Sequence, residues 1–381
     1  MDEIKRLFTI LMGWEGEDLR VVDAAFAAYV AIFLRGWIEP PWLGIVSAAS
    51  TGKSATLNSF KLCQSTELVS DISAKGLASG FRDDANPNFD PSILSRLQGG
   101  KVMLVHELTT LINKGEDQAK TLFGTLRAAF DGTFVNNTGR TGAVPYKDRF
   151  GFVFGCTPML DEWILLNQQL GERSVLIRMP VPQGVEARKA AGEAALKLSP
   201  EAKEALWREV QEKTAALVSE CKRREPPTDD PVIRRRIRDL ANVVVMARSV
   251  HHDGSLVAAE GQYRMTQQLD ALCAGHSLVL GRESWSEESF PICQLIARHT
   301  IHPELLKVLE VVWRGSAEKA VEPMTREQCL AQTAGAKKKF MGNQLDQWAY
   351  TRVLKKLEGG TFGMDPEFAA DAAATGFLLG G

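Results

Sequence analysis

The spacing of apolar side chains along the chain predicts helices first and alternating strands and helices afterwards. Residues 4–37 carry apolar positions at helical spacing, such as Leu7 and Leu11, and Pro40 and Pro41 end this helical region. Short apolar runs then predict strands, and turn-rich or helical segments separate them. The predicted strands are the run that starts at Pro41, then 67–69, 101–105, 150–156 and 174–179, with a β-hairpin formed by 133–135 and 143–146.

The elements between these strands are predicted helices over 55–62, 91–97 and 119–130. Strands that alternate with helices are typical of an α/β fold with a parallel sheet. After Pro182 the chain is rich in Ala, Leu, Glu, Lys and Arg and has a helical pattern. Near His302 a further unit begins, with predicted helices at 304–313, from Thr325, and at 344–357, an order that resembles a winged helix-turn-helix.

These changes divide the chain into five expected regions. They are N-terminal helices (1–41), a P-loop core (42–182), a helical lid (183–302), a winged helix-turn-helix (303–357) and a loosely ordered tail of small and apolar residues (358–381).

Composition restricts the partners and the compartment. The formal net charge of −2 excludes a bulk electrostatic attraction to nucleic acid, so any DNA contact must come from local patches. The six cysteines are scattered without a C-x-x-C pair, which favours reduced thiols in the cytoplasm and argues against a zinc site. The apolar segment 21–34 is too short to span a bilayer, and no basic leader precedes it. We therefore expect a cytoplasmic protein without a membrane partner.

The first candidate site lies directly after the first predicted strand. A loop of small residues there ends in Gly52, Lys53 and Ser54. In a phosphate-binding loop, backbone N–H groups and the following helix start hold the phosphates, the lysine contacts the β- and γ-oxygens, and the hydroxyl ligates Mg²⁺. Ser47 stands where the full pattern has glycine. The predicted nucleotide-binding residues are Ala48, Ala49, Ser50, Thr51, Gly52, Lys53 and Ser54.

Two further strand ends carry polar side chains that hydrolysis can use. Glu107 follows the strand 101–105, which we expect beside the loop strand, and is the predicted group that polarises the attacking water. His106 stands where an aspartate normally helps to hold Mg²⁺, so Ser54, His106 and Glu107 are the candidate metal residues. Thr157 ends the strand 150–156 and is a candidate sensor of the γ-phosphate. A capping glutamate and a Thr-Pro turn are the alternatives.

Basic residues supply the remaining candidates. Arg173 precedes the last strand and is expected to face outward, towards a neighbouring subunit's γ-phosphate, with a surface ion pair as the alternative. The runs 222–224 and 234–236 have the pattern of solvated helix faces. Between the presumed helices of the C-terminal unit lie Lys337, Lys338 and Lys339, which can contact DNA phosphates, although such a unit can also bind protein.

The order of these motifs resembles an AAA+ ATPase of the helicase branch. More narrowly, 126–132, 155–158 and 171–173 resemble the ATPase region of phage and mobile-element replication helicases related to minichromosome-maintenance proteins, over about residues 25–300. The resemblance implies ATP and Mg²⁺ as cofactors and a homo-oligomeric, hexameric ring around single-stranded DNA. It also implies that Arg173 acts in trans, that Arg264 is a second sensor, and that Arg140 and Lys147 on the hairpin contact DNA in the pore.

Three hypotheses of function follow. The first is an ATP-hydrolysing DNA helicase or translocase of phage or plasmid-type replication. The second is an ATP-switched initiator, helicase loader or scaffold with slow hydrolysis, which His106 and the expected lack of an N-terminal oligonucleotide-binding domain favour. A replication protein that binds the winged unit is a further expected partner. The third is a small-molecule kinase, for which the lid, hairpin and winged unit have no evident use.

Overall fold

The computed structural model describes most of the chain, in two compact units. The described residues are 1–34, 40–70, 72–78, 92–113, 115–132, 134–138, 142–146, 148–166, 173–180, 189, 192–193, 196–249, 261–317, 324–331 and 338–377. The first unit comprises Met1–Thr228 and Ala271–Ile292, and the second comprises Asp229–Asp270 and Cys293–Gly381. The helical region expected as a lid therefore contributes to both units.

A five-stranded parallel sheet forms the centre of the first unit, in the order β2-β3-β6-β1-β7. The strands are β1 (Trp42–Val46), β2 (Thr66–Val69), β3 (Val102–Val105), β6 (Gly151–Cys156) and β7 (Ser174–Arg178). All residues of β1, β3 and β6 are buried, which explains why these segments are continuous apolar runs rather than alternating ones. The predicted α/β fold with a parallel sheet is confirmed.

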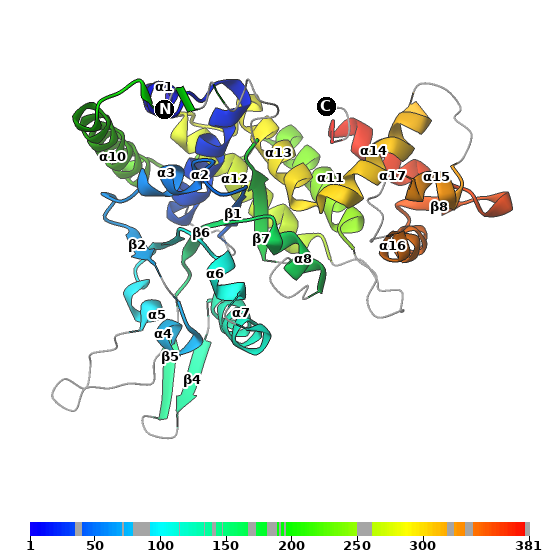
Figure 1. Ribbon diagram of the computed structural model, residues 1–381, viewed down its shortest axis with the longest axis horizontal. Coiled ribbons are helices and arrows are strands. Elements are labelled where there is room, and N and C mark those ends of the chain that lie inside the picture. The colour runs from blue at the N-terminus through cyan, green and yellow to red at the C-terminus, as the bar shows by residue number, and fades with distance from the viewer. Residues whose placement is uncertain are drawn as a thin grey trace. The chain divides into compact units, whose positions relative to one another are not determined.

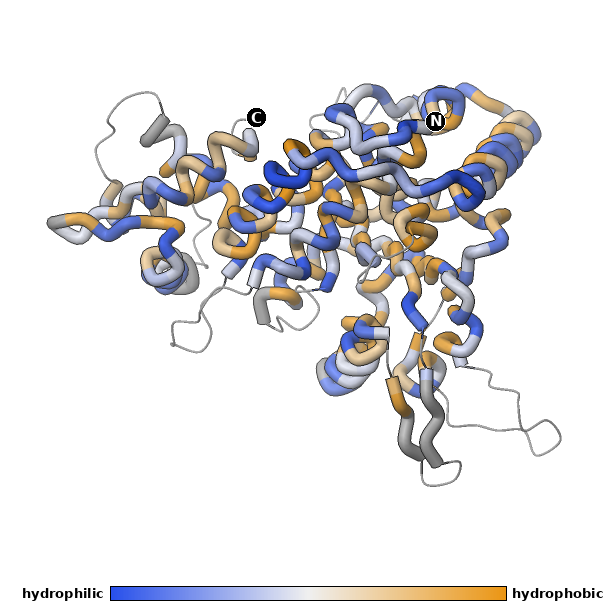
Figure 2. Tube along the Cα trace, turned by 180° about the vertical axis from the view of Figure 1, so that it is seen from behind, coloured by the Kyte–Doolittle hydropathy of each residue, from blue (hydrophilic) through white to orange (hydrophobic). Residues whose placement is uncertain are grey.

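Helices cover the two faces of this sheet (Figure 1). One face packs on α2 (Arg20–Val30), and side chains from α7 (Glu116–Phe130) and its neighbours pack on the other, around Trp42. The other helices of this unit are α1 (Asp2–Met12), α3 (Lys53–Asn58), α4 (Ala74–Leu77), α5 (Ile93–Arg96), α6 (Thr109–Ile112), α8 (Met159–Leu166) and α10 (Pro200–Arg223), with 3-10 turns η1 (Gly16–Leu19), η2 (Ala31–Phe33) and η3 (Glu287–Ser289). Hydrophobic and hydrophilic residues alternate along α10 in Figure 2, as in a helix with one buried face.

Close packing of small residues joins α2 to α12 (Tyr263–Val279) within the first unit. A Cβ atom added to Gly275 would lie 2.3 Å from the carbonyl oxygen of Ala27, so only glycine allows the two backbones to approach this closely. The flanking alanines of α2 are buried as well. The alanine-rich stretch is thus a helix–helix contact rather than a membrane segment, and in the described part of the chain no helix is long and apolar enough to cross a membrane.

The predicted hairpin is present as β4 (Phe134–Thr138) and β5 (Gly142–Tyr146), paired antiparallel with Phe134 opposite Tyr146. These two side chains hold its base, because Tyr146 is buried and Phe134 packs against the core. The tip residues, including Arg140, lie outside the described residues, and so does Lys147.

The second unit is helical and contains a small hairpin before its last helix. It begins with α11 (Pro231–Ala247), continues with the part of α12 up to Asp270, and includes the part of α13 (Phe290–Thr300) that starts at Cys293. The elements that follow are α14 (Pro303–Ala317), α15 (Arg326–Leu330), α16 (Lys338–Tyr350), β8 (Leu354–Lys356), η5 (Glu358–Gly360), β9 (Phe362–Met364) and α17 (Pro366–Ala374). Trp348 is buried at its centre and donates a hydrogen bond to Ala247 O (3.0 Å).

Two expectations for this unit are wrong. The helix predicted over 344–357 ends at Tyr350, and Arg352 takes a left-handed conformation (φ 63°) before the chain continues as β8. The expected loosely ordered tail instead contains β9 and α17, and Phe368 and Phe377 bury their rings. Apolar side chains at the end of the chain therefore complete a core.

Candidate functional site

The loop between β1 and α3 has the backbone that close approach to a ligand requires. Ser47 N–H still bonds to Cys156 O (3.1 Å), and the chain then turns through Ser50 (φ 63°) and Gly52 (φ 104°) before α3 begins. A Cβ atom on Gly52 would lie 2.2 Å from the ring of Trp14, which packs over the loop from the segment after α1. Glycine at position 52 is therefore required both by backbone conformation and by packing.

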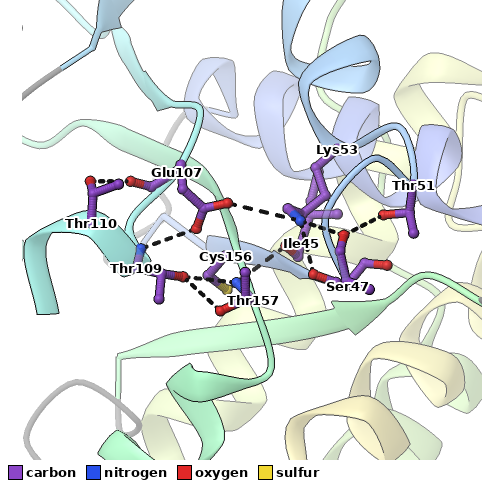
Figure 3. Close-up of polar contacts among 10 residues, drawn as sticks. Ile45, Ser47, Thr51, Lys53, Glu107, Thr109, Thr110, Cys156 and Thr157 are labelled. Carbon is purple, nitrogen blue, oxygen red and sulfur yellow. Dashed lines mark hydrogen bonds and ion pairs between the residues drawn. The ribbon is translucent and has the colours of Figure 1, made fainter. Parts of the chain in front are cut away.

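Lys53 lies beneath this loop and is almost fully buried. Its Nζ donates to Ser47 O and Ala48 O, both at 2.8 Å, and lies 3.9 Å from Glu107 Oε2 (Figure 3). The Thr51 hydroxyl also donates to Ala48 O (2.9 Å). The loop thus carries a buried cation at its base. The Ser54 side chain is on the exposed surface at the start of α3.

The route by which Glu107 reaches Lys53 differs from the expected one. The strand that carries Glu107 is not beside the loop strand, because β6 lies between β3 and β1. The turn after β3 instead crosses the end of β6: Leu108 N–H donates to Gly155 O (2.7 Å), and a Cβ on Gly155 would lie 2.3 Å from His106 O. Glycine at position 155 therefore lets the turn lie flat on β6 and carry Glu107 towards β1.

Thr109, which no sequence motif indicated, connects the two candidate catalytic strand ends. Its backbone N–H donates to Glu107 Oε1 (3.2 Å), and its Oγ1 accepts from Thr157 N–H (2.9 Å) and lies 3.1 Å from Thr157 Oγ1 (Figure 3). The side chain is 5% exposed. The only signal in the sequence was a hydroxyl residue two positions after the predicted glutamate.

His106 contacts a different partner from the one expected of a metal residue. Its Nε2 lies 2.9 Å from Asn58 Oδ1 at the end of α3, and Asn58 O in turn accepts from Gln211 of α10 (3.2 Å). Burial lowers the pKa of the imidazole, which favours the neutral form. The ring therefore ties β3 to the helix that follows the loop, and its Nε2 is committed to Asn58.

The expectation that Arg173 faces outward is wrong. The residue is 5% exposed, and its guanidinium carbon lies 5.8 Å from the centroid of the Phe130 ring. Arg173 directly precedes β7. It lies at the amino ends of the strands, opposite the loop, because Ser174 pairs with the first residue of β1. At the other end of β7, Arg178 makes a two-pronged ion pair with Asp161 (2.7 Å for each bond).

The structure brings together Lys53, Glu107 and Thr157 and leaves several other predicted residues untested. Arg264 lies in the first turn of α12, in the second unit. Lys337 lies outside the described residues, as do the side chains of Lys338 and Lys339 and the predicted motif residues 171 and 172. Their roles stay predictions.

The donor set fits a nucleotide triphosphate with a divalent cation. A buried ammonium group lies under a loop of small residues, a hydroxyl is exposed at the start of the next helix, and a carboxylate from a nearby turn lies 3.9 Å from the ammonium group. All six cysteines are buried thiols that form no disulfide, and the described residues contain no cluster of three or more His, Cys, Asp or Glu side chains that could hold a metal ion by themselves. In comparisons with known proteins, neither protein-family models nor curated sequences match this chain.

Proposed function

We propose that the first unit binds ATP with Mg²⁺ and hydrolyses it. The observation that carries this proposal is the approach of Glu107 Oε2 to within 3.9 Å of Lys53 Nζ at the loop edge of the parallel sheet. Ligands of open parallel sheets bind outside the carboxyl ends of the strands, where this pair lies. A cation that binds phosphate and a carboxylate that orients water are the two groups that phosphoryl transfer to water requires.

Each group has a defined role in this proposal. The loop N–H groups and Lys53 hold the phosphates, and the Ser54 hydroxyl ligates the cation, which neutralises charge on the phosphates. Glu107 accepts a hydrogen bond from the attacking water and orients it. Thr157, directly after β6, lies beside Glu107 and Thr109 and senses the terminal phosphate. When phosphates occupy the loop, Lys53 exchanges its bonds to Ser47 O and Ala48 O for bonds to phosphate oxygens.

We further propose that the ATPase is an AAA+ DNA helicase or translocase of phage or plasmid-type replication, working as a homo-oligomeric ring. The support is the resemblance together with the arrangement of elements. A hairpin leaves the core between α7 and β6, and the second unit has the element order α14, α15, α16, β8, β9 of a winged helix, including a bridge from Met324 to Phe362. Single-stranded DNA in the pore and a replication partner on the winged unit belong to this proposal.

Two observations favour a second candidate, an ATP-switched initiator, helicase loader or scaffold with slow hydrolysis. Arg173 is buried over Phe130, whereas an arginine that acts on a neighbouring subunit must be exposed. His106 is bonded to Asn58, and an imidazole, unlike a carboxylate, has no negative charge to offer the cation. An arginine in place can supply about 10³–10⁵ in rate, so its absence alone would make hydrolysis slow.

Steady-state ATP hydrolysis with and without single-stranded DNA separates these candidates. Wild type, Glu107→Gln and the exposed control Glu204→Gln are compared, with ATP affinity measured in parallel. Hydrolysis that DNA stimulates, that Glu107→Gln abolishes and that Glu204→Gln leaves intact supports the motor. Retained ATP binding with hydrolysis near background supports the switch, and no ATP binding by the wild type refutes both.

A further inference from the structure

Beyond the residues that contact nucleotide, the hydrogen bonds of Thr109 identify a positioning role. We infer that Thr109 couples the candidate base Glu107 to the candidate sensor Thr157, so that its hydroxyl group sets the rate of hydrolysis without contributing to ATP binding. This inference rests on the proposed ATPase function.

Thr109 lies between the start of α6 and the end of β6, next to the backbone bond from Leu108 N–H to Gly155 O. Thr109 opens α6, just after the turn that leaves β3, whereas Thr157 follows the last residue of β6. The Thr109 hydroxyl accepts the Thr157 N–H (2.9 Å) and shares a hydrogen bond with the Thr157 hydroxyl (3.1 Å). One side chain therefore fixes both the backbone and the side chain of Thr157.

The carboxylate of Glu107 is anchored by the same residue. Thr109 N–H donates to Glu107 Oε1, while Oε2 faces Lys53 at 3.9 Å. The direction of that N–H depends on where the start of α6 lies, and the Thr109 hydroxyl fixes that position against β6. A displacement of the sensor strand end is thereby transmitted to the carboxylate that orients water.

The burial of Thr109 determines the cost of losing its hydroxyl group. Thr109 is 5% exposed, so water does not replace its hydroxyl group readily when that group is removed. A valine would fill almost the same space but leave the Thr157 N–H without its acceptor. The neighbouring Thr110 is different, because its hydroxyl is exposed and donates only to the Glu107 main-chain carbonyl (2.9 Å).

The test compares Thr109→Val, which removes the hydroxyl, with Thr109→Ser, which keeps it. The control is Thr214→Val, a buried threonine of α10 whose hydroxyl has no hydrogen-bond partner among the described residues. Turnover, ATP affinity by calorimetry and thermal unfolding are measured for each. We expect Thr109→Val to lower kcat about tenfold or more with ATP affinity unchanged, and Thr109→Ser to restore most of it.

The outcomes separate this inference from the proposed function. A wild-type protein that binds ATP but does not hydrolyse it refutes the motor and this inference together. Wild-type hydrolysis with an equal kcat in Thr109→Val, or a loss that Thr109→Ser shares, overturns the inference alone. If Thr109→Val does not fold, Thr109→Ala removes the same hydroxyl with a smaller side chain, and an unchanged kcat in that variant has the same meaning.

Discussion

Gly155→Ala tests the crossing of the β3 turn over β6. The added Cβ would lie 2.3 Å from His106 O, whereas carbon–oxygen contacts in proteins are about 3.3 Å or longer. The backbone at His106 must therefore move by about 1 Å, because a main-chain carbonyl cannot rotate away as a flexible side chain does. Glu107 is the next residue, so the displacement reaches the carboxylate that faces Lys53.

The size of the effect follows from that displacement. Overpacking a well-packed interior costs about 1–3 kcal/mol of stability, which a folded domain tolerates. A catalytic group misplaced by about 1 Å can lose about 100-fold in rate. We therefore expect Gly155→Ala to remain folded, to bind ATP through the unchanged loop, and to hydrolyse it about 100-fold more slowly.

A glycine at the other end of the same strand provides the control. At Gly151 the added Cβ would lie 3.1 Å from the side chain of Val102, which can shift, and no candidate catalytic group adjoins it. ATP turnover, ATP affinity and urea unfolding are compared for Gly155→Ala, Gly151→Ala and wild type. Turnover by Gly155→Ala equal to that of Gly151→Ala would show that the crossing does not position Glu107.

Two further predictions concern stability. Burial raises the pKa of Asp270 from 3.8 to about 7, and Arg234 offsets this rise only in part. The carboxyl group therefore binds more protons in the folded chain than in the unfolded chain. As the pH rises from about 4 to 7, this difference lowers the free energy of unfolding by up to about 4 kcal/mol. Urea unfolding of Asp270→Asn should therefore show a gain over wild type at pH 8 and little difference at pH 4; a gain independent of pH would contradict this. Gly275→Ala should lower the free energy of unfolding by about 1–3 kcal/mol, because the added Cβ would overlap Ala27 O. The control Gly192→Ala should not lower it, because no atom lies within 4 Å of the added Cβ. Equal stability of the two variants would contradict this prediction.

The strands and the loop lysine could be predicted because their signals are local. A strand buried on both faces must be a continuous apolar run, and a phosphate loop must be made of small residues before its lysine. The position of β6 between β1 and β3 was not predictable in this way, since the order of parallel strands depends on long crossover connections. The distance between Glu107 and Lys53 depends on that order.

The remaining differences come from tertiary contacts that leave no local pattern. Arg173 has the sequence neighbours of an exposed arginine, and only the fold brings the Phe130 ring beneath it. His106 is bonded to Asn58, a residue of a different element. The helix predicted to continue to 357 keeps its apolar spacing, but Val353 N–H bonds back to Trp348 O (2.8 Å) and the chain leaves the helix there.

The division of α12 between the two units has a consequence for the order in which the protein folds. Residues 271–292 belong to the first unit, yet 229–270, which belong to the second, precede them in the chain. A ribosome therefore releases the smaller, first part of the second unit before the first unit can be completed. Until residue 275 emerges, α2 lacks the partner backbone at Ala27, and its row of alanines stays available to chaperones or to premature association.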